Sequence, residues 1–196
     1  MLIYVHGFNS SPASIKARQL GARLESIGRA AEFSCPALPD RPDDAIAVLE
    51  RELRRHAAES ITLVGSSLGG YYATHVAERF GLRTVLLNPV VRPYDLLHDY
   101  VGIQRNLYTG EEIVVEARHL GELRALEVEP LAAPSRYFLI VTTGDEVLDY
   151  RQAVEKYRGA RQLVIEGGDH SLNTFPAYLD DALRFCGVAV PSPPRV

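Results

Sequence analysis

Short apolar runs alternate with longer amphipathic stretches along most of this chain. Runs rich in aliphatic and β-branched residues predict strands near residues 2–5, 31–35, 61–64, 84–87, 136–142 and 162–165. Helical patterns separate these runs near residues 12–27, 42–58, 68–80, 149–158 and 173–186. Strands that alternate with helices favour a parallel sheet, because each parallel connection needs a crossover. The pattern therefore predicts an α/β fold with a mostly parallel, six-stranded sheet and helices on both of its faces.

One stretch, from residue 90 to about residue 131, interrupts this alternation. It is too long for a simple connection, and long insertions in compact domains are often lids or binding loops. Its apolar side chains are candidates either for an acyl pocket or for the core of a small helical subdomain, and they are Leu96, Leu97, Tyr100, Ile103, Leu107 and Tyr108. We predict a single domain over residues 1–187 with a lid-like helical insertion at 90–131, followed by a flexible tail over residues 188–196.

Composition and charge narrow the class of protein. The chain has 196 residues, of which 46% are hydrophobic, as expected for one globular domain with a substantial core. A net charge of −4 and the absence of a dense basic run argue against nucleic acid as a partner. No signal peptide or membrane span is apparent in the sequence, so a cytoplasmic location is expected. Cys35 and Cys186 are expected to be buried free thiols, not a disulfide or metal site.

Residues 61–70 have the sequence Ile-Thr-Leu-Val-Gly-Ser-Ser-Leu-Gly-Gly, an apolar run that enters a glycine-rich turn before a helical pattern. A nucleophile elbow requires this strand-turn-helix context. Ser67 has glycine two positions before and two positions after it, whereas Ser66 has Val64 and Leu68 at those positions. Ser67 is therefore the candidate nucleophile. On this motif alone, an ordinary glycine-rich turn between a strand and a helix is the alternative.

Two further groups follow in the order that a Ser-acid-His triad takes in hydrolase sheets. Asp145 comes just after the apolar run 136–142, and His170 comes just after the run 162–165 and two glycines. Both positions follow the carboxyl ends of predicted strands, where parallel sheets place their ligand sites. His170 would take the proton of Ser67, and Asp145 would fix the histidine tautomer and stabilise its cation.

Three other acidic residues near these positions are rivals of Asp145. Glu146 follows in the same turn and is expected to point elsewhere. Asp149 opens a predicted helix, where a carboxylate suits the positive end of the helix dipole. Asp169 adjoins His170 and is poorly placed to reach its ring. Asp145 is the preferred acid, and Asp149 is next.

An oxyanion hole in this architecture uses the amide after the nucleophile and an amide from a loop after an earlier strand. The first is Leu68, and we expect the second to be Phe8, because Gly7 lets the backbone approach the site. Asn9 is the alternative donor. His6, at the end of the first predicted strand, is either a base or a group that shapes the oxyanion loop, and its position favours the structural role.

Several blocks together resemble the YqiA-like bacterial esterases of the α/β-hydrolase superfamily, from Met1 to about Cys186. These blocks are His6-Gly-Phe-Asn-Ser-Ser-Pro12, Gly65-Ser-Ser-Leu-Gly-Gly-Tyr-Tyr-Ala73, Leu87-Asn-Pro89 with Arg92-Pro93, Gly144-Asp-Glu-Val-Leu-Asp-Tyr-Arg151 and Gly168-Asp-His170. The resemblance implies a hydrolase core without its first two strands and the hydrolysis of carboxylic esters or acyl thioesters. It also implies Ser67 as nucleophile, Asp145 as acid and His170 as base.

The sequence therefore predicts a serine esterase or thioesterase that acts on a small-molecule ester or acyl thioester and needs no cofactor. An amidase is an alternative, because it would use the same triad. A noncatalytic hydrolase-fold protein that serves as a binding or scaffold module is a further alternative, although such proteins typically lack a triad member.

Overall fold

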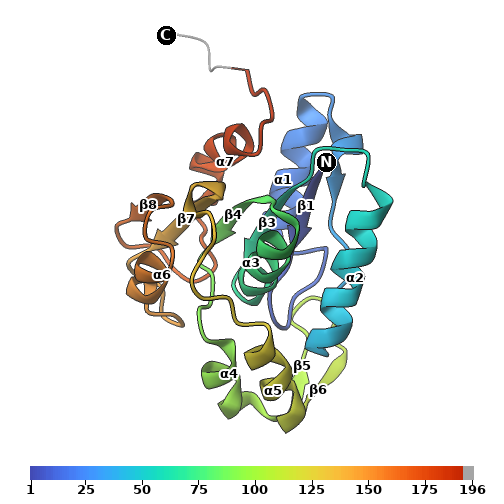
Figure 1. Ribbon diagram of the computed structural model, residues 1–196, viewed down its shortest axis with the longest axis vertical. Coiled ribbons are helices and arrows are strands. Elements are labelled where there is room, and N and C mark those ends of the chain that lie inside the picture. Colours follow the sequence, from blue (N-terminus) through green and yellow to red (C-terminus); the bar gives the residue numbers. More distant parts are fainter. Residues whose placement is uncertain (192–196) are drawn as a thin grey trace.

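A computed structural model of the chain, which describes residues 1–191, contains a six-stranded parallel sheet (Figure 1). Its strands are β1 (Leu2–Val5), β2 (Phe33–Ser34), β3 (Thr62–Ser66), β4 (Arg83–Leu87), β7 (Tyr137–Thr142) and β8 (Arg161–Ile165). The strands lie in the order β2-β1-β3-β4-β7-β8, and every neighbouring pair is parallel. The predicted six-stranded sheet is confirmed, and in the described residues it is parallel throughout.

Helices cover both faces of this sheet, as predicted. The main helices are α1 (Ile15–Ser26), α2 (Pro42–Arg55), α3 (Leu68–Phe80), α6 (Tyr150–Lys156) and α7 (Leu179–Phe185). Buried side chains of α2, α3 and α6 pack on one face of the sheet, and those of α1 and α7 pack on the other. Side chains alternate between the two faces along a strand, so that in β1 Ile3 and Val5 belong to the first core and Leu2 and Tyr4 to the second.

The bounds of some elements differ from the prediction for local reasons. Helix α1 begins at Ile15 and not near residue 12, because Ser11 accepts hydrogen bonds from the Ala13 and Ser14 amides and folds residues 11–14 into a turn. Short 3-10 helices take part of the expected strand at 31–35 and of the expected helix at 173–186. The first of these is η1 (Ala30–Glu32) and the second is η4 (Phe175–Ala177). The described residues also contain the 3-10 helices η2 (Leu97–Tyr100) and η3 (Pro134–Arg136).

The insertion lies at one end of the sheet, at the bottom of the view in Figure 1. Besides η2, its elements are α4 (Pro93–Leu96), β5 (Gly102–Arg105), β6 (Glu112–Val115) and α5 (Ala117–Ala125). Strands β5 and β6 form a separate antiparallel pair. The insertion contains the predicted helices, but it also contains this strand pair, which the prediction of a helical insertion did not include. In β6 the side chains of Ile113 and Val115 are buried and that of Val114 is exposed, which is the period of two that a half-buried strand shows.

The structure describes only the first part of the predicted tail. Val188, at the start of the predicted tail, packs into the core, and residues 192–196 lie outside the described residues.

Cys35 and Cys186 are free and half-buried, and burial raises the pKa of each thiol to about 12. No helix within residues 1–191 is long and apolar enough to cross a membrane.

Candidate active site

Ser67 lies in the turn between β3 and α3, with φ of 53° and ψ of −122°. A positive φ is costly for a residue with a side chain, by about 1–3 kcal/mol. Hydrogen bonds hold the turn in this conformation: the Ser67 amide donates to the Leu87 carbonyl at 3.1 Å, and the Gly70 amide donates to the Ser67 carbonyl at 2.9 Å. In this strained turn the Ser67 side chain faces the loop that carries His170.

The glycines on both sides of Ser67 are needed because backbone crosses directly over the turn. A Cβ atom at Gly65 would lie 2.5 Å from the Gly69 carbonyl oxygen. A Cβ atom at Gly69 would lie 2.0 Å from the Val5 carbonyl oxygen. Real Cβ atoms do not approach backbone oxygens this closely, so the turn can form only with glycine at these positions.

We predict that Gly69→Ala lowers the free energy of unfolding by about 3 kcal/mol, because the new methyl group overlaps the β1 backbone. In a chain of this size the change corresponds to a fall of about 6–12 °C in the melting temperature. Gly121→Ala is the matched control, since Gly121 lies in α5 with open space around its Cβ position. That variant should be slightly stabilised, by up to about 1 kcal/mol. Equal melting temperatures for both variants, measured by calorimetry, would contradict the close approach at Gly69.

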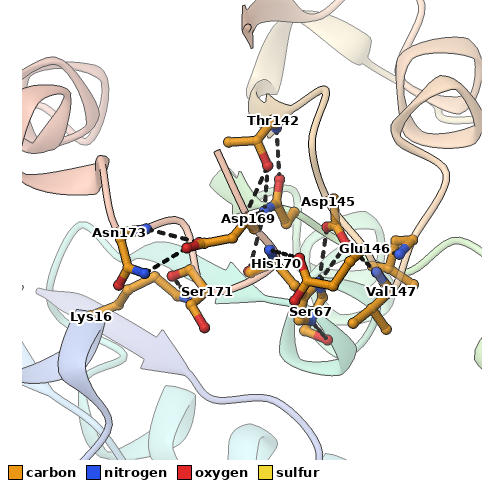
Figure 2. Close-up of polar contacts among 12 residues, drawn as sticks. Lys16, Ser67, Thr142, Asp145, Glu146, Val147, Asp169, His170, Ser171 and Asn173 are labelled. Carbon is orange, nitrogen blue, oxygen red and sulfur yellow. Dashed lines mark hydrogen bonds and ion pairs between the residues drawn. The ribbon is translucent and has the colours of Figure 1, made fainter. Parts of the chain in front are cut away.

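His170 connects Ser67 to Asp145 through both nitrogens of its ring (Figure 2). Its Nε2 lies 3.1 Å from Ser67 Oγ, and its Nδ1 lies 2.8 Å from Asp145 Oδ2. The three groups come from the ends of β3, β7 and β8. The structure thus brings the predicted nucleophile, base and acid into one continuous chain of hydrogen bonds.

Asp145 is held as a carboxylate by its surroundings. Burial by itself would raise its pKa, but the hydrogen bond with His170 and those donated by the Leu148 and Val147 amides outweigh burial and hold the pKa below its usual value. An ionised carboxylate can only accept hydrogen bonds. His170 therefore carries its proton on Nδ1, and Nε2 is left to accept the proton of the Ser67 hydroxyl.

Each rival of Asp145 has another partner. Glu146 accepts a hydrogen bond from the His170 backbone amide at 2.9 Å. Asp149 caps α6 by accepting from the Arg151 amide at 3.0 Å. Asp169 accepts from the amide and the side chain of Asn173. None of these three carboxylates bonds to the His170 ring within the described residues.

The loop that carries His170 is fixed by residues that the sequence analysis did not single out. The Asn88 side-chain amide donates to the Asp169 and His170 carbonyls at 3.1 and 3.2 Å, and its oxygen accepts from the Thr142 amide at 3.0 Å. The Thr142 hydroxyl also donates to the Asp169 carbonyl. Asn88 directly follows β4 and has a positive φ of 41°, which is unusual for a residue other than glycine. In the sequence, Asn88 was noted only within the Leu87-Asn-Pro89 block, and that block and its place at the end of a buried strand were the signals of this role.

The amides proposed for the oxyanion hole flank Ser67. Phe8 and Leu68 both line a small cavity that also includes Ser67 and His170. Within residues 1–191, neither the Phe8 N–H nor the Leu68 N–H donates a hydrogen bond to another protein atom. Asn9, the alternative donor, has a positive φ of 53°. Both predicted amides are therefore available to a ligand next to Ser67.

Within residues 1–191, the His6 ring forms no hydrogen bond with Ser67. Its Nε2 accepts a hydrogen bond from the Leu38 amide at 3.1 Å, so its Nδ1 carries the proton and donates to the Gly7 carbonyl at 3.1 Å. Burial lowers the pKa of His6, which keeps the ring neutral. This arrangement ties the loop after β1 to the loop after β2 and supports the structural role for His6.

The β5–β6 turn also holds the oxyanion loop. The Leu107 amide donates to the Asn9 carbonyl at 2.9 Å, and the Asn106 side-chain amide donates to the Ser10 carbonyl at 2.9 Å. The Asn106 side-chain oxygen accepts from the Tyr108 and Thr109 amides and so shapes the turn itself. The insertion is therefore bonded directly to the loop that supplies Phe8.

Two small cavities meet at Ser67 and His170. One, of about 120 Å³, is mostly apolar and is bordered by Val90, Pro93, Leu96, Leu97, Tyr100 and Val147. The other, of about 130 Å³, is more polar and is bordered by the first turn of α1 and the tip of the β5–β6 hairpin. Of the apolar residues predicted for an acyl pocket, Leu96, Leu97 and Tyr100 border the first cavity, and Leu107 and Tyr108 border the second. Ile103 borders neither and is 69% exposed.

Solved structures of other proteins share this fold. The α/β hydrolase domain-containing protein 10 from mouse is 18% identical with a TM-score of 0.67, and the match covers 93% of this chain and 89% of that one. Est1E from Butyrivibrio proteoclasticus, in a structure with ferulic acid bound, is 13% identical with a TM-score of 0.66, over 93% of this chain and 86% of Est1E. A monoacylglycerol lipase from Paleococcus ferrophilus is 14% identical with a TM-score of 0.65, over 94% of each chain. The predicted α/β-hydrolase fold is confirmed, and it resembles the folds of esterases and lipases.

A comparison at the level of sequence families matches residues 1–187 to the family described as Uncharacterised protein family (UPF0227). The matched range spans all of the main sheet and every residue of the candidate site.

Proposed function

The chain belongs to the UPF0227 family, the YqiA-like group that its motifs resemble, and from this premise and the site geometry we propose a serine hydrolase that cleaves carboxylic esters or acyl thioesters. The observation that carries the proposal is the hydrogen-bonded chain from Ser67 through His170 to Asp145. A serine hydroxyl is a weak nucleophile at neutral pH, and an adjacent base that is itself oriented by a third group activates it.

The reaction proceeds in two halves. Ser67 Oγ attacks the carbonyl carbon of the substrate, and His170 Nε2 accepts the hydroxyl proton. The carbonyl oxygen becomes an oxyanion that accepts hydrogen bonds from the Phe8 and Leu68 amides. When the tetrahedral intermediate collapses, His170 gives its proton to the leaving alcohol or thiol, and the acyl group stays on Ser67. His170 then takes a proton from water, the hydroxide attacks the acyl carbon, and the acid leaves as Ser67 regains its proton.

The apolar cavity favours binding of the acyl group of the substrate on that side of Ser67. Its volume of about 120 Å³ and its mostly apolar border suit a short acyl chain. The ferulic acid bound to Est1E is a carboxylic acid, the class of product that such a reaction releases. Both observations favour acyl transfer to water.

Fluorophosphonate labelling tests the proposal, because this probe reacts covalently with activated serines. We expect one adduct on Ser67 of the folded protein, located by mass spectrometry, and none after heat denaturation. Ser66→Ala is the matched control and should keep the adduct, because Ser66 ends β3 and lacks the flanking glycines. No adduct in a protein shown to be folded by circular dichroism, or an adduct on another serine, would contradict the assignment of Ser67.

A matched substrate series tests the class of bond that is cleaved. Rates on a p-nitrophenyl butyrate ester, a butyryl thioester and a butyryl p-nitroanilide compare an ester, a thioester and an amide with the same acyl group. We expect hydrolysis of the ester or the thioester to exceed that of the anilide. A faster rate on the anilide would favour the amidase.

We also predict that Asn106→Asp lowers kcat about tenfold with little change in KM, because a small displacement of an oxyanion donor weakens transition-state binding. The aspartate keeps the oxygen that shapes the turn but loses the donor to the Ser10 carbonyl. In the same turn, the Thr109 hydroxyl bonds to Glu111 and forms no hydrogen bond with the oxyanion loop in the described residues, so Thr109→Ala should retain the wild-type kcat. Steady-state kinetics on p-nitrophenyl butyrate give both values, and equal rates in the two variants would show that the hairpin does not position Phe8.

A further inference from the structure

The polar cavity beside Ser67 has a composition that the acyl-transfer mechanism does not explain. It occupies about 130 Å³ and is bordered by Ser67 and His170 together with Ser14, Lys16 and Tyr108. It meets the apolar cavity assigned to the acyl group at Ser67, His170 and Phe8, which border both cavities. A substrate whose acyl group fills the apolar cavity would therefore direct its leaving group toward Lys16.

Lys16 carries a positive charge into this cavity without a matching carboxylate. Its Nζ donates to the Ser171 carbonyl at 2.8 Å (Figure 2), and within residues 1–191 it forms no ion pair. The two nearest carboxylates have other partners, since Asp169 is bonded to Asn173 and Asp145 to His170. Burial lowers the pKa of Lys16 to about 8, although the charges of Asp169 and Asp145 act in the opposite direction. An anion bound here would compensate a charge that the protein leaves only partly balanced.

A second, independent feature of the cavity also indicates a ligand. The hydroxyl of Ser14 is buried, its residue is 6% exposed, and the oxygen lies near the Tyr4 phenol but in no well-formed hydrogen bond among the described residues. Buried polar groups in folded proteins are nearly always paired. Ser14 directly precedes α1, a helix of 12 residues whose first turn therefore presents its positive end to the same cavity.

We propose that this cavity binds a carboxylate on the leaving group of the substrate, through the ammonium of Lys16, the hydroxyl of Ser14 and the positive end of α1. The inference rests on the proposed function and adds the class of substrate: esters whose alcohol carries a small acidic group. A cavity of about 130 Å³ has room for such a group.

A pair of esters of nearly equal size provides the test. Both 3-carboxyphenyl butyrate and 3-carbamoylphenyl butyrate release a phenol, but only the first has a charged leaving group. We expect the wild-type protein to hydrolyse the carboxylate with a kcat/KM about tenfold above that of the amide, as one charge-assisted contact allows. In Lys16→Met this ratio should fall to about one, and in Lys16→Arg most of it should remain.

Lys156→Met is the matched control. Lys156 is the other lysine of the chain, and its Nζ likewise donates to a backbone carbonyl, that of Val128. It lies on α6 and borders neither cavity at Ser67. This variant should keep the wild-type ratio.

The outcomes separate this inference from the proposed function. Hydrolysis of both esters with a ratio of about one in the wild-type protein would overturn the anion site and leave the hydrolase proposal intact. No hydrolysis of either ester by folded protein would count against the hydrolase proposal itself. If Lys16→Met slows both esters equally and keeps the ratio, Lys16 only supports the loop of His170 through Ser171, and the anion site is wrong.

The preference should also depend on pH in a defined direction. Lys16 is charged below a pKa of about 8 and neutral above it, so the ratio of kcat/KM values should be highest below pH 8 and fall above it. The other titratable groups around the cavity are Asp145, Asp169, His170, Tyr4 and Tyr108. Any effect of these groups applies to both esters, whereas Lys16→Met should remove only the change in the ratio. A ratio that does not vary between pH 7 and pH 9 would contradict the role of the ammonium.

Discussion

Ser67→Ala is expected to lower kcat for p-nitrophenyl butyrate by about four to six orders of magnitude, because we propose Ser67 as the group that forms the acyl-enzyme. The rate that remains should reflect only binding and the oxyanion donors. The substitution removes one oxygen from a residue whose φ of 53° is held by backbone hydrogen bonds, so the fold should persist. Steady-state kinetics and a burst-phase measurement of p-nitrophenol release check the loss.

Ser66→Ala is the control for this experiment, as it is for the labelling. Ser66 is buried at the end of β3 and should retain turnover within a few-fold of wild type. Wild-type rates in Ser67→Ala would show that another group is the nucleophile. Absence of turnover in the wild-type protein, together with binding of esters, would instead favour a noncatalytic hydrolase-fold protein.

The sequence was informative about the site because its residues lie in local motifs at the ends of strands. The elbow at Gly65–Gly69 specifies a turn that only glycine permits at both flanks, as the close approach of Gly69 to the β1 backbone shows. Asp145 and His170 follow strands β7 and β8, and parallel strands bring their carboxyl ends to one edge of the sheet. Position along the chain was therefore enough to predict that these side chains meet.

Other parts of the site depend on contacts between distant segments, which periodicity does not indicate. Asn88 and Thr142 hold the His170 loop from two neighbouring strands. The β5–β6 hairpin reaches the oxyanion loop through Asn106, about a hundred residues away in the sequence. Strands β5 and β6 have four residues each, and such short alternating runs are hard to distinguish from helical ones in a polar segment.

The surroundings of Lys16 also could not be predicted from the sequence. In the sequence it appears as an ordinary lysine near the start of an amphipathic helix, where solvent would be the default surrounding. Only the fold places its ammonium beside the Ser171 carbonyl, 155 residues later in the chain, and at the border of a cavity next to Ser67. A sequence pattern can predict which side chains react more readily than which side chains select a substrate, because selection depends on the walls of a cavity built from several segments.

Asp145→Asn should lower kcat by about 10⁴-fold while the protein remains folded. The asparagine keeps the size of the side chain, but its amide group can donate to His170 Nδ1. That bond would favour the tautomer with the proton on Nε2, which cannot accept the proton of Ser67. The hydrogen bonds that hold Asp145 as a carboxylate are the reason to expect that it orients the histidine.

Asp149→Asn is the matched control, because Asp149 was the nearest rival of Asp145 and the substitution is chemically the same. Asp149 caps α6 through the Arg151 amide, and asparagine is also a good cap, so this variant should keep both stability and kcat close to wild type. Steady-state kinetics on p-nitrophenyl butyrate and thermal unfolding of both variants separate a catalytic effect from a structural one. A large loss of kcat in Asp149→Asn, with Asp145→Asn still active, would transfer the role of the acid to Asp149 and require the loop after β7 to rearrange when substrate binds.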